Sequence, residues 1–185
     1  MDGTTQITVR RCAREISDAL ETIDDFDSLT ASTGASLVKL MERPDLLCNA
    51  FPVRTHRIPI WLLYCDAELT LLIGREEAHV TVPIHDHGTW EMLGIYRGKI
   101  DHSRYERLDS GEEAGSHAEL REVERRTMER GETVLLPKPP HDIHSFTALA
   151  DDTLVLAVIP GWYPGYRRYF DLETNSYFME PRTPV

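Results

Sequence analysis

The chain has 185 residues, which suits one domain that is long enough to bury a sizeable core. Its formal net charge of −11 argues against nucleic acid as the main partner, because a phosphate backbone is bound by clustered positive charge. Hydrophobic residues make up 41% of the chain and charged residues 28%, which is ordinary for a soluble globular protein.

The cysteine pattern and the apolar runs bear on where the protein works. Cys12, Cys48 and Cys65 are far apart and form no CxxC pair, so we expect neither a disulfide framework nor a zinc knuckle. The first residues lack the apolar core of a signal peptide, and no apolar run approaches the roughly 20 residues that span a bilayer. We therefore expect a cytoplasmic protein with no membrane partner.

The N-terminal quarter predicts helix. Apolar residues recur every three or four positions over residues 7–25, and the aspartates that close this segment oppose the helix dipole, which predicts fraying there. A second helix is expected over residues 35–42, stopped by Pro44. We expect residues 1–50 to form a helical extension that packs over one face of a sheet.

From residue 51 the pattern changes to short strands separated by turn signals, which is typical of an all-β sandwich or barrel. The highly charged stretch 119–129 is compatible with helix or strand, and its neighbours favour strand. We expect a jelly-roll barrel over residues 51–172 and a loose C-terminal tail over 173–185. The expected strands are 58–64, 69–73, 78–84, 92–96, 99–108, 119–129, 133–136, 146–149 and 153–159.

A histidine pair marks the chemistry. His85 and His87 lie two apart, so on a strand both imidazoles point to one face, and neutral imidazole is the commonest metal ligand in proteins. Glu91 and Gly98 follow at regular positions, and His144 is supplied by a later strand. By itself an HxH pair also fits two ordinary half-exposed residues. With its context it predicts one metal ion held between the two stretches.

The chain contains two spaced motifs, His85-x-His87-x3-Glu91-x6-Gly98 and Gly131-x5-Pro137 followed by His144. They resemble the two motifs of the cupin superfamily. This resemblance implies an all-β fold, the cupin double-stranded β-helix or jelly-roll barrel, here with N-terminal helices.

Within the cupins, the local sequence is more similar to bacterial thiol dioxygenases of the cysteine dioxygenase type, which include 3-mercaptopropionate dioxygenases. The similarity runs over most of the chain, from about Trp61 to Asp171. The stretches that carry it are 83–87, Trp90, 93–94, 97–98, 142–144 and 165–171.

The resemblance implies a mononuclear non-haem Fe(II) held by His85, His87 and His144. A thiolate and O2 would bind to the open face of the metal, and the sulfur would be oxidised to a sulfinic acid. An arginine would hold the substrate carboxylate as a bidentate partner. By the resemblance Arg168 is the first choice for this role and Arg167 the second.

Other residues are assigned more loosely. Tyr163 or Tyr166 could supply a catalytic phenol from the loop that precedes the arginines, and His141 and Trp90 could line the substrate pocket. The remaining histidines have no partner spacing and are expected to be structural or exposed. They are His56, His79, His102 and His117.

The chain departs from the thiol dioxygenases at two places. Glu91 stands where those enzymes carry cysteine or glycine, and in many other cupins a glutamate there is a fourth metal ligand. Such a ligand set is also used with Mn, Ni or Zn. The Ser-x-His-x-Tyr triad of those enzymes corresponds here to three apolar residues, Val155, Ala157 and Ile159.

Three functions therefore follow as hypotheses. The first is an Fe(II) dioxygenase that acts on a small thiol carboxylate. The second is a three-His-one-Glu cupin with a non-thiol substrate, another oxygenase or an isomerase. The third is a non-catalytic metal- or ligand-binding cupin. The expected partners are a small-molecule substrate and O2, and the expected assembly is a monomer or a homodimer.

Overall fold

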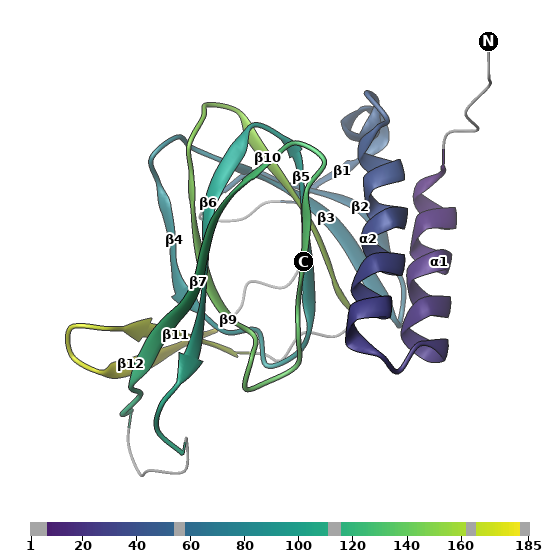
Figure 1. Ribbon diagram of the computed structural model, residues 1–185. Coiled ribbons are helices and arrows are strands. Elements are labelled where there is room, and N and C mark those ends of the chain that lie inside the picture. The colour runs from purple at the N-terminus through teal and green to yellow at the C-terminus, as the bar shows by residue number, and fades with distance from the viewer. Residues whose placement is uncertain (1–6, 54–57, 111–115, 162–165, 182–185) are drawn as a thin grey trace.

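The computed structural model describes residues 7–53, 58–110, 116–161 and 166–181. Two helices stand beside a barrel of two antiparallel sheets, each with six strands (Figure 1). The helices are α1 (Val9–Thr22), α2 (Phe26–Met41) and the short 3-10 helix η1 (Leu46–Asn49). The strands are β1 (Phe51–Val53), β2 (Ile60–Cys65), β3 (Leu69–Glu76), β4 (Thr81–His85), β5 (Glu91–Arg97), β6 (Lys99–Arg107), β7 (Leu120–Glu129), β8 (Thr133–Leu136), β9 (Ile143–Ala148), β10 (Thr153–Pro160), β11 (Tyr166–Asp171) and β12 (Ser176–Pro181).

The strand pairing is that of a jelly roll. One sheet has the order β1-β2-β3-β10-β5-β8 and the other β12-β11-β4-β9-β6-β7. The central strands pair as a nested series, β3 with β10, β4 with β9, β5 with β8 and β6 with β7, and successive pairs alternate between the sheets. This is a long hairpin folded over on itself into two layers. The expected all-β jelly roll with N-terminal helices is confirmed.

The barrel interior is apolar and draws on both sheets. It forms because strand side chains alternate in direction, so each sheet turns one set of residues towards the other sheet. Its buried residues are Leu93, Ile95, Ile100, Met128, Val134, Leu136, Phe146, Val155 and Ala157.

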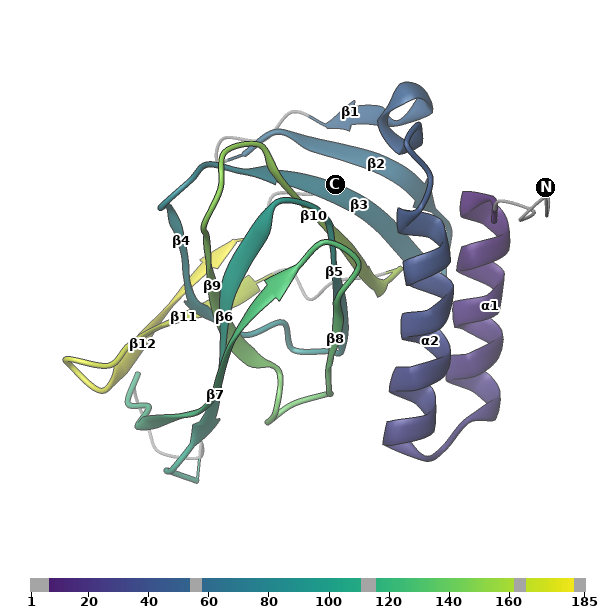
Figure 2. The same cartoon turned by 45° about the horizontal axis from the view of Figure 1, so that its top comes forward.

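A second apolar cluster fills the space between the helices and the outer face of the first sheet. Helix α2 lies directly against β5 and β8, and α1 packs beside α2 (Figure 2). The approach of α2 is close, because a Cβ on Gly94 of β5 would lie 2.8 Å from Met41 Sδ. The predicted packing of the N-terminal helices over one sheet face is thus found, with Ile16 and Leu37 among the fully buried side chains.

The helix boundaries differ from those expected. Helix α2 begins at Phe26, nine residues before the expected start, and α1 ends at Thr22. The Asp25 carboxylate accepts a hydrogen bond from the backbone N–H of Ser28 at 2.8 Å and caps α2. Acidic residues that oppose the dipole at the end of one helix therefore stabilise the start of the next, where Asp27 lies in the first turn.

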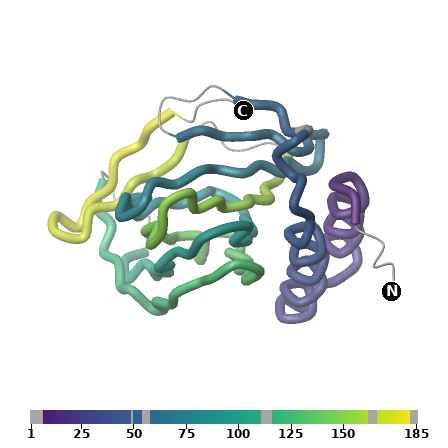
Figure 3. Tube along the Cα trace, turned by 90° about the horizontal axis from the view of Figure 1, so that it is seen from above, coloured from purple at the N-terminus to yellow at the C-terminus, as the bar shows by residue number. Residues whose placement is uncertain are grey.

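The expectation of a loose tail after residue 172 is wrong for residues 176–181. They form β12, which pairs in continuous antiparallel register with β11, from Asp171 opposite Ser176 to Tyr166 opposite Pro181. The hairpin of these two strands projects from the barrel on the side opposite to the helices (Figures 1 and 3). Within the described residues, neither α1 nor α2 is long and apolar enough to cross a membrane.

Gly98 makes the tight turn between β5 and β6, and Gly131, between β7 and β8, serves as its comparison. Gly98 has a φ of +76°, and a Cβ there would lie 3.0 Å from the Cα of Thr153, whereas Gly131 has a φ of +89° and open space around it. We predict that Gly131→Ala lowers the free energy of unfolding by about 1–2 kcal/mol through backbone strain alone. Gly98→Ala should cost about 2–4 kcal/mol, because the clash adds to the strain. Urea denaturation measures both, and equal losses would contradict the close contact with Thr153.

Candidate metal centre

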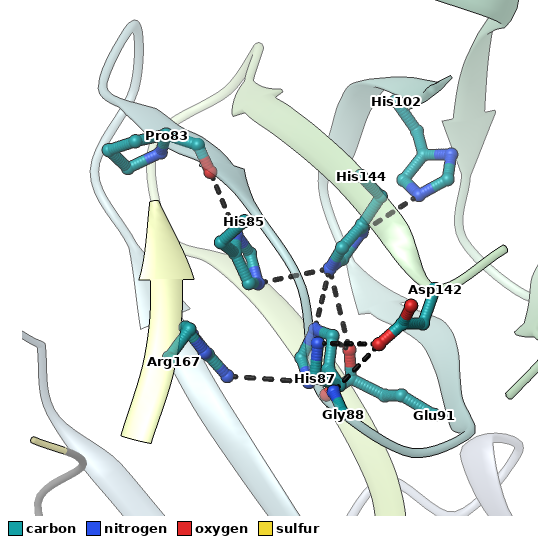
Figure 4. Close-up of polar contacts among 9 residues, drawn as sticks. All are labelled: Pro83, His85, His87, Gly88, Glu91, His102, Asp142, His144 and Arg167. Atoms are coloured by element: carbon teal, nitrogen blue, oxygen red, sulfur yellow. Dashed lines mark hydrogen bonds and ion pairs between the residues drawn. The ribbon is translucent and has the colours of Figure 1, made fainter. Parts of the chain in front are cut away.

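Three buried histidines from two segments converge at one end of the barrel. His85 is the last residue of β4, His87 follows it, and His144 is the second residue of β9. Nε2 of His144 lies 2.9 Å from Nε2 of His87 and 3.1 Å from Nε2 of His85 (Figure 4). One ligand atom from each histidine lies within 4.8 Å of the other two, and each residue is at most 2% exposed.

These separations suit a shared metal ion. Two ligands at right angles on a metal with bonds of about 2.1 Å are about 3.0 Å apart. The tautomer of His85 suits it as well, since Nδ1 lies 2.7 Å from the carbonyl oxygen of Pro83, which can only accept. The proton of His85 therefore sits on Nδ1, and the lone pair of Nε2 faces the other two rings. A divalent cation is the group that such a donor set fits.

The position of His85 depends on an irregularity in β4. Val82 of β4 lies opposite Phe146 of β9, and His85 lies opposite His144. The chain advances three residues on β4 over this interval but only two on β9, so β4 contains one extra residue. Such a bulge re-aims the side chains that follow it. As a result Val82 packs against the barrel interior, and His85 faces the same centre as His144.

His87 reaches the centre for a different reason from the one predicted. Strand β4 ends at His85, so the rule that alternate strand residues share a face does not apply to His87. Its segment is held instead by the buried carboxylate of Asp142, which accepts the backbone N–H of His87 at 3.0 Å and that of Gly88 at 2.7 Å. Burial raises the pKa of Asp142, and these two N–H bonds oppose that rise by stabilising the charged form.

Glu91 brings a carboxylate to the histidines from the opposite sheet. It is the first residue of β5, is 5% exposed, and its Oε2 lies 2.8 Å from Nε2 of His87 and 3.5 Å from Nε2 of His144. An oxygen in this place can serve as a further metal ligand. The centre therefore lies between the two layers of the jelly roll, with His85 and His144 on one sheet and Glu91 on the other.

The protonation of His144 favours ligand binding. Burial, together with the neighbouring rings of His85 and His87, holds the pKa of His144 well below its usual range. The ring is therefore neutral near pH 7, and a neutral imidazole is the form that binds a metal.

The two arginines of β11 point in different directions. Nη2 of Arg167 lies 3.4 Å from Nδ1 of His87, which is not the ring nitrogen that lies near His144 and Glu91, so this side chain contacts the outer side of the His87 ring. Arg168 turns the other way: its Nε donates to Asp86 Oδ2 at 2.5 Å, and its guanidinium lies over the ring of Tyr177. Of the two arginines, the structure brings the second choice to a ligand ring and gives the first an ion pair elsewhere.

The other predicted site residues lie apart from the centre or outside the described part of the chain. His141 is exposed, and Trp90 packs against the apolar cluster under the helices. Tyr163 falls outside the described residues. Val155 and Ala157, two of the three apolar residues at the positions of the triad, face the barrel interior.

One residue at the site was missed. His102 on β6 is fully buried, and its Nε2 lies 3.1 Å from Nδ1 of His144. Burial, aided by the positive charges of Arg126 and Arg104, lowers the pKa of His102 to about 4. Strand alternation from Ile100, a core residue, predicts that His102 points inward, and this was the available signal.

Comparison with known proteins finds only distant structural similarity. No protein-family model matches the chain, and no curated protein sequence does. Among solved structures, KdgF from Halomonas is similar with a TM-score of 0.45 and 15% identity, covering 60% of this chain and 87% of that one. An RmlC-like cupin from Shewanella frigidimarina has a TM-score of 0.45 and 10% identity, covering 62% and 86%. Oxalate oxidase in complex with glycolate has a TM-score of 0.37 and 20% identity, covering 49% and 40%.

The histidine centre predicts one divalent metal per chain. We expect His144→Ala to weaken metal binding by at least about 100-fold, since it removes a ligand rather than a supporting contact. His141→Ala is a matched control from the same segment, because His141 is exposed and should leave affinity unchanged. Metal content after dialysis and competition with a chelator measure both. Equal affinity in the two variants would contradict the assignment of His144.

The buried histidines also predict how the stability of the metal-free protein depends on pH. A pKa of about 4 for His102 in the folded state, against 6.5 when unfolded, means that the unfolded chain binds more protons between these values. Stability from this group should therefore rise with pH over that window, by about 1.4 kcal/mol per unit. Urea denaturation at pH 5 and pH 7 should show a smaller difference in His102→Leu than in the wild type. An unchanged difference would contradict the buried neutral ring.

Proposed function

We propose that the protein is a mononuclear metal-dependent enzyme that oxidises a small organic acid with O2. The observation that carries this proposal is the carboxylate of Glu91, whose Oε2 lies 2.8 Å from Nε2 of His87 within the histidine cluster. His85, His87, His144 and Glu91 would hold the ion, with Fe(II) as the first choice and Mn, Ni or Zn as alternatives. A bound Fe(II) would supply the redox chemistry with O2.

The ligand set limits what can bind. Three neutral imidazoles and one carboxylate would reduce the net charge of a divalent ion to about +1. A fourth protein ligand would leave less room at the ion than three histidines alone, so this ligand set would favour substrates with one donor atom over a chelating amino thiol.

Arg167 supports a carboxylate on the substrate. Its Nη2 is 3.4 Å from Nδ1 of His87, so its guanidinium lies next to a ligand ring. With a metal on Nε2, Nδ1 of His87 would carry the proton, and the guanidinium would be released to bind the substrate. A guanidinium binds a carboxylate through two parallel N–H bonds and so orients it as well as holding it. Val155 and Ala157 belong to the apolar interior of the barrel, which would help to exclude water.

Among small organic acids, a thiol carboxylate is one candidate substrate. Arg167 and the resemblance to thiol dioxygenases favour it. A thiolate would bind through sulfur alone, both atoms of O2 would enter the product, and the thiol would become a sulfinic acid. This reaction balances without a further reductant. It needs no second donor from the substrate, so Glu91 could remain a ligand.

The test is O2 uptake by protein loaded anaerobically with Fe(II). The panel pairs small thiol carboxylates, including cysteine and 3-mercaptopropionate, with hydroxy and keto acids of the same size. We expect uptake with at least one acid and a KM about 10- to 100-fold higher in Arg167→Met, because the charged anchor is lost. Arg168→Met is the matched control and should change KM little.

Glu91→Gln tests the fourth ligand, and the substrate panel separates the two substrate classes. If Glu91 ligates the metal, this variant should change metal affinity and metal selectivity while the fold persists. Uptake that requires a thiol identifies a thiol dioxygenase, and uptake with non-thiol acids alone identifies another oxygenase. Stoichiometric bound metal with no uptake on any acid would contradict the proposed enzyme and favour a metal- or ligand-binding protein.

A further inference from the structure

A fourth histidine lies behind the metal centre and is hydrogen-bonded to His144, one of the three proposed ligands. Nε2 of His102 lies 3.1 Å from Nδ1 of His144, the ring nitrogen that faces away from His85 and His87. His102 is fully buried, and the two residues come from neighbouring strands, β6 and β9 (Figure 4). Neither ring can adjust by moving into solvent.

The hydrogen bond between these rings has two possible directions, and only one permits metal binding. If His102 donates from Nε2, then Nδ1 of His144 is an acceptor and its proton sits on Nε2, where it blocks the metal. If His144 donates from Nδ1, its Nε2 carries the lone pair that a metal needs. Ligation by His144 therefore requires His102 to be neutral and to accept through Nε2.

We propose that His102 is a positioning residue, whose Nε2 accepts the Nδ1–H of His144 and so sets the tautomer and the ring orientation of this ligand. The inference rests on the proposed metal site and adds to it a second histidine that never touches the ion. Metal-binding histidines generally donate their other ring N–H to an acceptor, often a carboxylate or a carbonyl. Here a neutral imidazole takes that place.

The arrangement has a cost that a purely structural histidine would avoid. When Nε2 of His102 accepts, its proton sits on Nδ1, and this atom is buried with no hydrogen-bond partner among the described residues. A buried N–H without a partner costs about 1–3 kcal/mol. An apolar residue of similar size would avoid that cost, so His102 lowers the stability of the fold while serving the ligand.

Two substitutions separate positioning from packing. The amide oxygen of His102→Gln can reach the place of Nε2 and accept the same hydrogen bond, whereas His102→Leu fills the space without an acceptor. We expect His102→Leu to weaken Zn(II) binding by about 10- to 100-fold and His102→Gln to retain affinity within about threefold of the wild type. The metal-free His102→Leu protein should be at least as stable as the wild type in urea at pH 7.

Nuclear magnetic resonance of the Zn(II)-loaded protein gives an independent readout. The Nδ1–H proton of His144 should give a slowly exchanging signal in the wild type and in His102→Gln, and this signal should be lost or exchange rapidly in His102→Leu. The inference is overturned if the two variants bind Zn(II) equally well, or if His144 carries its proton on Nε2. If the wild type itself binds no Zn(II), the metal site fails together with the inference. If it binds and His102→Leu binds as tightly, only the role of His102 fails.

Discussion

The register between β4 and β9 is the constraint on which the candidate site depends. His85 lies opposite His144 across this pair, and the extra residue in β4 is what turns His85 towards the centre. Every other element of the site is arranged around that cross-strand pair. Asp142, two residues before His144, holds the segment of His87. Glu91 then enters from the opposite sheet, because the nested pairing brings the start of β5 over the same end of the barrel.

The centre combines a polar end with an apolar interior. Around the ligands, carbonyl, carboxylate and imidazole partners determine how the rings are turned, as Pro83 does for His85. Deeper in the barrel, Phe146 and Ala157 belong to an apolar core. Burial in these surroundings keeps His144 neutral, so one physical effect both stabilises the fold and prepares a metal ligand. Metal affinity and folding are therefore linked through the same residues.

Much of this could be predicted from the sequence. The strand over residues 133–136 matches its expected bounds, because its apolar run lies between a glycine turn and a proline. The histidine triad was also predicted, since His85, His87 and His144 carry chemistry that ordinary strand residues lack. His87 was nevertheless expected to share a strand face with His85, and this was wrong because β4 ends at His85. Where a strand ends depends on its pairing with distant strands.

What could not be predicted depends on long-range register or on local caps. Arg167 and Arg168 are adjacent and chemically identical, and only the pairing of β11, with Tyr169 opposite His85, decides which one contacts His87. Asp25 could end one helix or begin another, and its side-chain bond to the backbone of Ser28 decides for the second. His102 has no partner nearby in sequence, so its contact with His144 follows only from the pairing of β6 with β9.

The central claim is that one metal ion is bound by three histidines and Glu91 between the two sheets. Anomalous X-ray diffraction from crystals of the Fe(II)- or Mn(II)-loaded protein tests it most directly. The account predicts one strong peak about 2.1 Å from Nε2 of His85, His87 and His144 and from a carboxylate oxygen of Glu91. A peak bound by the histidines but distant from Glu91 would contradict the four-ligand site. A peak elsewhere on the chain would contradict the centre itself.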